Sequence, residues 1–561
     1  MVKSVMADNS NRINRRSFVA ALGLAGATSV AGCSGSQSTN DGENTTTEQE
    51  SSNNNSGNSE QTETTEEMAS AYGGQLRVSV SRKPNTLNPI EHVNGAEYQV
   101  TGWLYSNLTR VDHNLEVHPD LATDWEANSD ASQWTFNLRE NATFNHNDKQ
   151  VTARDVKKTI ETVQDPDVGS PGKGAIGPIE SVEAVDETTA RINLTGPYAD
   201  IPKKMAKQFA RILPADVIEN RYDEIANTDF GSGPFNLETF EVGSIIETSK
   251  NEDYYLKSED GDQLPFVNGV NQRVYPETTA EISAMGNNTV DIMWEVPASQ
   301  YGRVQSQNGS EALRTAGGAF ANLVMRSDKP PFDDNRVRKA FKYAVDKKAM
   351  LEGAQNGLGV VAQDTLISPA YQFHTDLPSR ERDLEQASKL LEEAGYGDGL
   401  DLTLYAANEP AVRVTYATLL KNQLSEIGVN IEIEQVSYDR YLSEVWKQAP
   451  FYIGYYGMRF TEDGILYLLL HSEGSWNEAH WSDDEFDQVL NEARQTTDNE
   501  KRAELYARAQ EILHERGPYL VSFFQDELAA QRNYVEDYEL DPTGFFVPVE
   551  DVKLSEDAPT Q

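Results

Sequence analysis

Hydrophobic positions repeat every second residue in several short stretches of the chain. Leu76, Val78 and Val80 alternate with polar residues, and residues 134–138, WTFNL, alternate in the same way. Successive side chains of an extended strand point to opposite faces of a sheet, so both stretches are predicted to be strands with one buried face. Residues 291–296, DIMWEV, are also predicted to form a strand.

Other stretches repeat with the period of a helix. Residues 336–350 place five apolar side chains on one helical face: Val337, Ala340, Phe341, Ala344 and Val345. A second helix is predicted to begin after Asp383, an N-cap residue, and to end at Gly395. A third is predicted over 499–517, with its apolar side chains on one face.

The clearest unit of the chain covers residues 400–436. A strand of alternating apolar residues is followed by a helix over 411–427, Gly428 ends that helix, and 429–436 form a second strand. A strand, a helix and a strand of this length predict a parallel pair with a right-handed crossover. Strands and helices alternate in this way from Gly73 onward, which predicts a mixed α/β body with two lobes and a cleft between them.

The first residues have the pattern of an export signal. Residues 14–18 read NRRSF, an apolar run follows over 19–30, and the sequence VAGC ends at Cys33. The run is too short to span a bilayer, and the order of these features predicts a twin-arginine signal peptide over 1–33. VAGC resembles a lipoprotein box. We therefore expect cleavage before Cys33, lipidation of its thiol, and a protein anchored by lipid at the extracellular face of the cell membrane.

Residues 34–72 consist almost entirely of Ser, Thr, Asn, Gln, Gly and acidic residues. A segment without apolar side chains cannot bury a core, which predicts a disordered acidic tether. Its ends would lie roughly 35 Å apart on average. A second acidic segment, 546–561, is expected to be a C-terminal tail.

Acidic residues dominate the charge of the chain. There are 90 Asp and Glu against 48 Lys and Arg, a formal net charge of −42. Such a field repels phosphate backbones, so nucleic acid is excluded as a partner. An acidic surface favours solubility in high salt, the condition in which halophiles live. The single cysteine excludes a disulfide within the chain.

No motif of an enzyme or of a metal site occurs in the sequence. HExxH, GxSxG and the phosphate loop GxxxxGK[ST] are all missing, and the eight histidines are scattered. We therefore predict no catalytic residue, no metal ligand and no cofactor.

Segments in a fixed order resemble the extracellular solute-binding proteins of family 5, the peptide/nickel type that serve ABC transporters. The strongest likeness is KPPFDDNRVRKAFKYAVDKKAML, residues 329–351. The other segments that carry the likeness are LNP at 87–89, 118–156, FGSGPFNLETF at 230–240, 383–396, 422–434 and 502–524. Together they cover roughly residues 73 to 530. With the charge, the resemblance implies a lipoprotein of a halophilic archaeon.

The resemblance implies an α/β, periplasmic-binding-protein-like two-lobe flytrap of type II, of the large cluster with an extra inserted domain. One lobe would comprise 73–105, 226–318 and 516–545, the inserted domain 106–225, and the other lobe 319–515. Its implied function is that of the substrate-binding subunit of an ABC importer. Such a subunit captures a peptide or related small organic solute between its lobes and delivers it to the permease with its ATPase. Closure of the lobes requires differential affinity for the closed state, not chemistry.

The segment GYYGMRFTEDG, 454–464, carries the main candidate for ligand binding. In peptide-binding relatives this segment looks like GW.AD..DP, and its Asp grips the α-ammonium of the peptide. Aligning the glycines places Arg459 at that Asp and Tyr456 at the Trp. A guanidinium fork matches a carboxylate, so we hypothesise that Arg459 binds an anionic group, with stacking faces from Tyr455, Tyr456 and Trp476.

Two alternatives to this hypothesis stay open. Arg459 could pair with Glu462 or Asp463 as a structural clamp. Asp463 could instead serve the amine of a peptide if the alignment contains a short gap. The remaining candidates for ligand binding are Met458, Asn477, Asn85, Asn88 and Asn322. Trp294, in the predicted strand, is expected to be a core residue rather than a ligand contact.

Other functions also remain possible from the sequence. The protein could bind a metal chelate of the nickel type, or it could be a sensor that presents its closed state to a signalling partner. An exported hydrolase is a further alternative, but no ordered nucleophile motif supports it.

Overall fold

The computed structural model describes residues 73–559. The predicted signal peptide, Cys33 and the tether lie outside the described residues. Within the described part of the chain, no helix combines the length and the apolar composition needed to cross a membrane.

The strands of the described chain are mostly short. Their bounds are β1 Gln75–Val80, β2 Thr109–Val111, β3 Val117–Pro119, β4 Ala122–Ala127, β5 Gln133–Leu138, β6 Ile179–Ala184, β7 Thr189–Leu194, β8 Phe235–Glu241, β9 Ile245–Lys250, β10 Gly269–Val274, β11 Ile292–Met293, β12 Ser310–Met325, β13 Gly359–Val361, β14 Leu400–Ala407, β15 Val429–Val436, β16 Phe451–Tyr456, β17 Tyr519–Val521, β18 Phe523–Arg532, β19 Val535–Glu536 and β20 Lys553–Leu554.

The helices alternate with these strands. Their bounds are α1 Gly95–Leu104, α2 Ala153–Gln164, α3 Ile201–Lys204, α4 Ala215–Asn220, α5 Thr278–Gly286, α6 Ala298–Gln305, α7 Asn335–Ala344, α8 Lys347–Gln355, α9 Leu384–Glu393, α10 Val412–Leu424, α11 Tyr438–Arg440, α12 Glu462–Leu470, α13 Asp484–Gln495 and α14 Asn499–Arg516.

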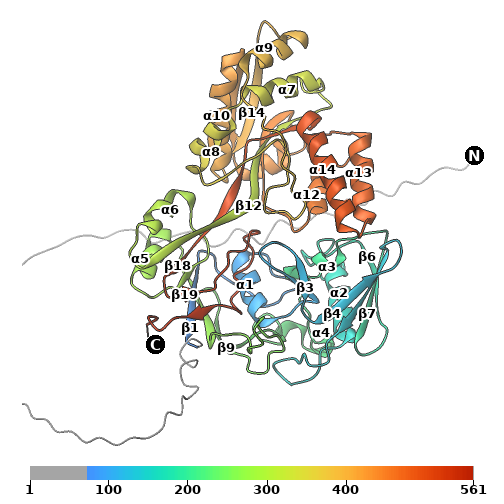
Figure 1. Cartoon of the computed structure of the whole chain (residues 1–561), viewed down its shortest axis with the longest axis vertical. Helices are drawn as coiled ribbons and strands as arrows, with labels where there is room; N and C mark the ends of the chain where they lie inside the picture. Colours follow the sequence, from blue (N-terminus) through green and yellow to red (C-terminus); the bar gives the residue numbers. More distant parts are fainter. Residues whose placement is uncertain (1–72, 560–561) are drawn as a thin grey trace, which may run out of the picture. The chain divides into compact units, whose positions relative to one another are not determined.

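The long strands β12 and β18 join the main sheet into one hydrogen-bonded network. Its order is β15-β14-β16-β12-β18-β11-β1-β10-β9-β8, with β13 and β17 pairing to the side. The first half of β12 pairs with β18 and its second half with β16, and Figure 1 shows β12 and β18 side by side. The pairing of β12 with β18 slips between Ala316 and Ala319, which places Gly317 and Gly318 in a bulge beside β16.

Several predicted elements are confirmed. β1 and β5 form where the apolar residues alternate. β14, α10 and β15 form the predicted unit, with the strands parallel and Leu400 opposite Val429. α10 continues into a 3₁₀ turn, Ser425–Ile427, and Gly428 ends that turn in a left-handed conformation, with φ +78°. Asp383 caps α9 by accepting a hydrogen bond from the Gln386 N–H, 2.8 Å, and α14 covers nearly all of 499–517.

The prediction of one helix over 336–350 is wrong. The structure has two helices, α7 and α8, separated by Val345 in an extended conformation. The side chain of Asp346 accepts a hydrogen bond from the Ala349 N–H, 2.9 Å, and so caps a new helix. The apolar period continues across the break, which is why the pattern alone did not indicate it.

The prediction of a strand over 291–296 is also too long. β11 covers only Ile292–Met293, and Trp294 follows it. The indole of Trp294 lies against Gly95, where an added Cβ would come within 2.2 Å of the ring. Trp294 therefore packs on the start of α1, partly buried at the edge of the core.

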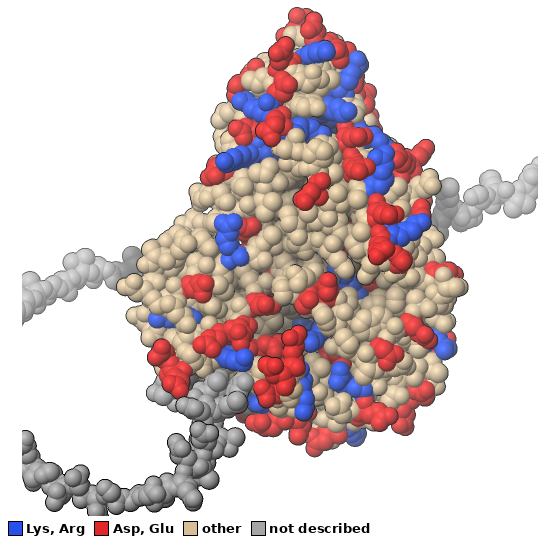
Figure 2. Space-filling model, in the orientation of Figure 1, with Lys and Arg blue, Asp and Glu red and all other residues tan. Residues whose placement is uncertain are grey.

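Smaller sheets and the chain end complete the fold. β4, β5, β7 and β6 form an antiparallel sheet, and α2 packs on it through apolar residues including Val156 and Ile160. The C-terminal segment is packed as far as it is described: β20 pairs with β19, and Val547, Val549 and Val552 are buried. Acidic side chains spread over the face shown in Figure 2, in line with the net charge of the chain.

Candidate functional site

Arg459 lies on the turn between β16 and α12. Gly454 of β16 is opposite Asn322 of β12, and a Cβ at this glycine would meet the Asn322 Oδ1 at 2.4 Å. The chain leaves the sheet after Tyr456 and enters α12 at Thr461, whose hydroxyl accepts a hydrogen bond from the Gly464 N–H, 3.0 Å. The sheet edge and the cap thus fix both ends of the short turn that carries Arg459.

The guanidinium of Arg459 is held beside aromatic rings. Its Cζ lies 5.5 Å from the centroid of the Trp476 ring, and its backbone N–H donates to the Tyr371 Oη, 3.0 Å. The side chain is half-buried, and this burial lowers the pKa of Arg459 below its usual value. Within residues 73–559 no carboxylate forms an ion pair with this guanidinium. The positive charge is therefore partly desolvated and unmatched.

The two acids that could have clamped Arg459 have other partners. Glu462 accepts a hydrogen bond from the Phe373 N–H, 2.8 Å. Asp463 lies 3.1 Å from the Nε of Arg494, and burial raises its pKa in spite of that cation. Neither acid therefore forms an ion pair with Arg459 in the described chain. An amine would also have to compete with Arg494 for Asp463.

The predicted aromatic residues surround the turn. The rings of Tyr456 and Trp476 are 6.2 Å apart, and Tyr456 donates its hydroxyl to a buried carboxylate, Glu478, at 2.8 Å. Tyr455 donates to the Gln525 side chain at 3.4 Å. Met458 fills the space left by the bulge in β12, where a Cβ at Gly318 would come within 2.5 Å of its Cγ.

Two predicted asparagines form hydrogen bonds near the turn that carries Arg459. Asn322 is fully buried and donates to Glu478 at 3.0 Å, so it helps to hold the carboxyl that binds Tyr456. Asn477 uses its amide within its own turn, donating to the Trp481 carbonyl at 2.6 Å. Trp481 is buried.

The other two asparagines lie apart from this turn. The Asn85 N–H donates to Glu97 at 3.0 Å, and the Asn88 side chain accepts from the Ile90 N–H at 3.0 Å. In the described chain, no hydrogen bond links either residue to the β16–α12 turn. Both shape the loop after β1.

Sequence reasoning missed two lysines beside Arg459. The Lys207 Nζ lies 5.1 Å from the centroid of the Phe460 ring. Lys204 and Arg459 both approach Gly464. A Cβ added at this glycine would lie 3.5 Å from the Lys204 Nζ and 3.5 Å from the Arg459 Cβ. Burial and the positive charges of Lys204 and Arg459 hold the pKa of Lys207 well below its usual range. The signal that could have found them is the run KKMAK in a chain short of cations.

A group of acidic residues adjoins the site on the side of Tyr455. Burial, together with the negative charges of Asp541, Glu295 and Asp526, raises the pKa of Glu527 to about 8. Burial also raises the pKa of Tyr455 to about 12, with smaller contributions from Glu527 and Glu295. The site thus has a cationic side at Arg459 and an acidic side at Glu527.

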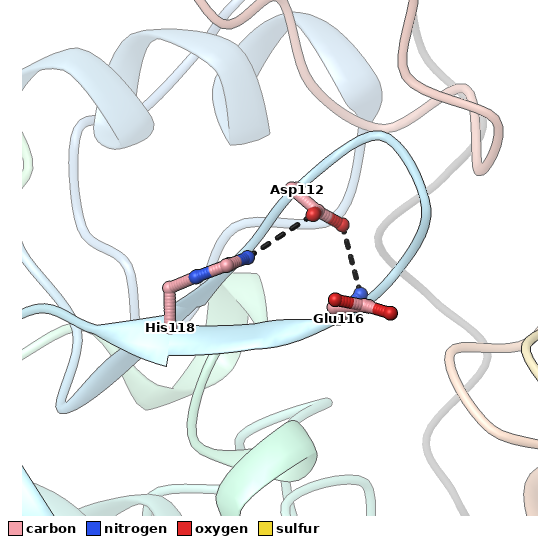
Figure 3. Close-up of side chains that lie close together, drawn as sticks. All are labelled: Asp112, Glu116 and His118. Carbon is pink, nitrogen blue, oxygen red and sulfur yellow. Dashed lines mark hydrogen bonds and ion pairs between the residues drawn. The ribbon is translucent and has the colours of Figure 1, made fainter. Parts of the chain in front are cut away.

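One cluster in the described chain has the residue types of a metal site. Asp112, Glu116 and His118 offer ligand atoms within 4.8 Å of one another (Figure 3). The Asp112 Oδ1 already accepts the N–H groups of Asn114 and Glu116, both at 2.9 Å, and its Oδ2 contacts the His118 Nε2 at 3.0 Å. These bonds are those of an Asp-stabilised turn between β2 and β3, and they account for the cluster without an ion.

Comparison with known proteins defines the class. The mixed α/β two-lobe fold is that of periplasmic binding proteins. The structure of HbpA2 from Haemophilus parasuis matches it with a TM-score of 0.79 at 22% identity, and the match covers 86% of this chain and 100% of that chain. A family model described as bacterial extracellular solute-binding proteins, family 5 Middle, matches residues 116–477. The chain belongs to this family, which confirms the likeness of its motifs.

Two curated relatives extend over nearly the whole body. Heme-binding protein A of Haemophilus influenzae is 26% identical over 514 residues, 85% of this chain and 92% of that protein. The dipeptide-binding protein of Escherichia coli K12 is 26% identical over 495 residues, 82% of this chain and 91% of that protein. The names of these two relatives differ in the solute, so membership of the family does not by itself specify what this chain binds.

Proposed function

We propose that this protein is the extracytoplasmic substrate-binding subunit of an ABC importer and that it captures a small organic solute through an anionic group bound by Arg459. The observation that carries the proposal is the half-buried guanidinium without an ion-pair partner in the described chain. Leaving a charge desolvated and unpaired costs several kcal/mol. A carboxylate of the solute would supply the missing partner with two parallel hydrogen bonds.

The surroundings of Arg459 suit an organic anion. Trp476 and Tyr456 present ring faces next to the guanidinium, and such faces bind apolar or planar parts of a solute. The family relatives named for dipeptide and heme support a peptide or a related organic molecule as the solute. The lobe division predicted from the sequence places Arg459 in the second lobe, and closure of the lobes would then commit the solute to the permease.

A second candidate is a peptide with a free amine. Glu527 is half-buried, and its carboxyl has three acidic neighbours and no cation among the causes of its raised pKa. An ammonium group there would relieve the repulsion, while Arg459 held the carboxylate of the same molecule. This arrangement would replace the usual amine grip at the position of Arg459.

Delivery to the membrane is part of the proposal. The arginine pair, the apolar run and Cys33 support export by the twin-arginine route and a lipid anchor. Mass spectrometry of the mature N-terminus, with Cys33→Ala as the control, would detect the lipid. We propose a transport role rather than catalysis; binding of a metal chelate and a sensor role remain the alternatives, and adjacent permease and ATPase genes would favour transport.

Thermal unfolding tests the anionic solute. The chain is heated in high salt with N-acetylated dipeptides, their C-terminal amides, free dipeptides, organic acids or nickel–histidine. A ligand that binds only the folded state raises the unfolding midpoint by mass action. We expect compounds with a free carboxylate to raise the midpoint and their amides to have no effect. Arg459→Ala should abolish the increase, whereas Arg303→Ala, an exposed arginine of α6, should not. Equal stabilisation of wild type and Arg459→Ala by carboxylates would refute the proposal.

A further inference from the structure

The neighbours of Arg459 carry more positive than negative charge. The segment 200–207, which contains α3, contacts the helices α12, α13 and α14 through charged side chains. Arg502 of α14 forms an ion pair with Asp200, and Arg494 of α13 forms one with Asp463. Both pairs are largely buried. The Arg502–Asp200 pair holds the segment against α14, and the Arg494–Asp463 pair joins α13 to α12. The Ala199 N–H, next to the segment, donates to the Arg494 carbonyl oxygen at 2.7 Å. The lysines of the same segment are placed beside Arg459 as a result.

The acids of this region are fewer than its cations. Six cations, Lys203, Lys204, Lys207, Arg459, Arg494 and Arg502, face three acids, Asp200, Glu462 and Asp463. Asp200 and Asp463 are already paired with arginines. Basic side chains thus outnumber acidic ones by three in this region of a chain whose net charge is −42.

Within the described residues, neither Lys203 nor Lys207 forms an ion pair with a carboxylate. The Lys203 side chain is buried, with 5% of the residue exposed, and its Nζ has no hydrogen-bond partner in the described chain. Lys207 contacts the Phe460 ring, and the charges that act on it, those of Lys204 and Arg459, are both positive. Desolvated like charges repel, so an arrangement of this kind is expected where a ligand brings the opposite charge.

We propose that Lys204 and Lys207, together with Arg459, bind a second negative charge of the solute, so that the transported molecule is a dianion. Two adjacent carboxylates or one phosphate group would satisfy this chemistry. The inference rests on the proposed function, because it assigns the charge class of the solute that Arg459 binds. Arg459 gives the planar fork for one carboxylate, and the lysines act as point charges for the second negative group.

The test compares monovalent with divalent anions on the full-length chain. Unfolding midpoints are measured at equal ionic strength with acetate, succinate or inorganic phosphate, for wild type, Lys207→Gln and Lys173→Gln. Lys173 is an exposed lysine of the same 106–225 segment and carries the matched change of charge. General effects of each salt on stability act on all variants alike and cancel in the comparison.

We expect succinate or phosphate to stabilise the wild type more than acetate does. Lys207→Gln should weaken divalent binding by about 10- to 100-fold, the effect of losing one hydrogen bond to a charged group, and should leave the acetate effect unchanged. Lys173→Gln should behave as the wild type, and Lys207→Arg should keep the divalent preference. A preference for succinate over phosphate would identify two carboxylates, and the reverse a phosphate group.

Three results would overturn the inference, and one of them would also refute the proposed function. The first is an equal divalent preference in wild type and Lys207→Gln while acetate still binds through Arg459, which leaves the proposed function standing. If no anion raised the unfolding midpoint of the wild type, and Arg459→Ala behaved in the same way, this inference and the proposed function would both be refuted. The third is a Lys207→Gln chain that unfolds several degrees below the wild type without any ligand. That would mean that the Lys207 ammonium stabilises the fold. Removing an ammonium without a negative partner should instead leave the stability of the chain unchanged or raise it.

Discussion

Replacing Glu527 by Gln should stabilise the protein in a way that depends on pH. Glu527 lies on β18 next to the site, half-buried among Asp526, Asp541 and Glu295, and its pKa is raised to about 8 from an ordinary value of 4.5. A glutamine has nearly the shape of a protonated glutamate and carries no charge. The variant therefore removes the cost of keeping this carboxyl protonated or burying it as an anion.

The sign and the size of the effect follow from the shift in pKa. A carboxyl whose pKa is higher in the folded state contributes stability that is present below pH 4.5 and lost as the pH rises to about 8. Each unit is worth about 1.4 kcal/mol, so the gain from Glu527→Gln is about 1 kcal/mol at pH 5 and about 3 kcal/mol at pH 7. These values are upper limits, because solvent reaches part of the carboxyl.

Calorimetric unfolding of wild type and variant between pH 5 and pH 8 measures this difference. The midpoint of Glu527→Gln should exceed that of the wild type by an amount that grows with pH. Glu432→Gln, at an exposed position of β15, is the matched control and should follow the wild type. A difference that is constant with pH, or a variant less stable at pH 8, would refute the reasoning and mean that Glu527 has a cationic partner in solution.

Three further predictions concern the segment 200–207, two glycines and the lysine beside Arg459. Arg502→Ala removes one partner of the ion pair with Asp200, whose side chains are 9% and 5% exposed, and should lower the free energy of unfolding by about 3–5 kcal/mol in urea titrations. Arg508→Ala, at a more exposed arginine of the same helix, should cost less than about 1 kcal/mol. Equal losses would contradict a stabilising role of the buried pair. Gly302→Ala, in α6 with no atom within 4 Å of the new Cβ, should raise the free energy of unfolding by about 0.5–1 kcal/mol. Gly231→Ala should impair folding, because its Cβ would come within 1.8 Å of the Leu104 carbonyl oxygen. Soluble expression and melting curves test both predictions. Binding of succinate should take up protons, because an anion raises the lowered pKa of Lys207. The calorimetric binding enthalpy should therefore vary with the ionisation enthalpy of the buffer, and the affinity for succinate should fall as the pH rises. A binding enthalpy that is the same in all buffers would count against proton uptake by Lys207.

Elements whose signals are local were predictable from the sequence. Alternation placed β1 and β5. Asp383 marked the start of α9 and Gly428 the end of the turn after α10, because caps and left-handed turns depend on the residue itself. The break before α8 was missed because the apolar face continues through Val345 while the side chain of Asp346 starts a new helix. β11 was predicted too long, since Trp294 has an apolar position without a strand partner.

The site was predictable only where its residues are close in sequence. Arg459 and its aromatic neighbours share one segment and could be aligned with the family pattern. Lys204 and Lys207 reach the same place from a distant part of the chain. The ion pair between Asp200 and Arg502 holds their segment against α14, and no pattern in the sequence records that pair. Asp463 looked free for an amine because its partner lies on another helix.

The central claim is that Arg459 binds an anionic group of the solute. The most direct measurement is a crystal structure of the chain with the carboxylate that gives the largest increase in unfolding midpoint. We expect an oxygen of the bound anion to lie within hydrogen-bond distance of the Arg459 guanidinium, with the body of the solute against Trp476. A solute bound elsewhere, or one whose ammonium group occupies this position while Arg459 turns to a carboxylate of the protein, would contradict it.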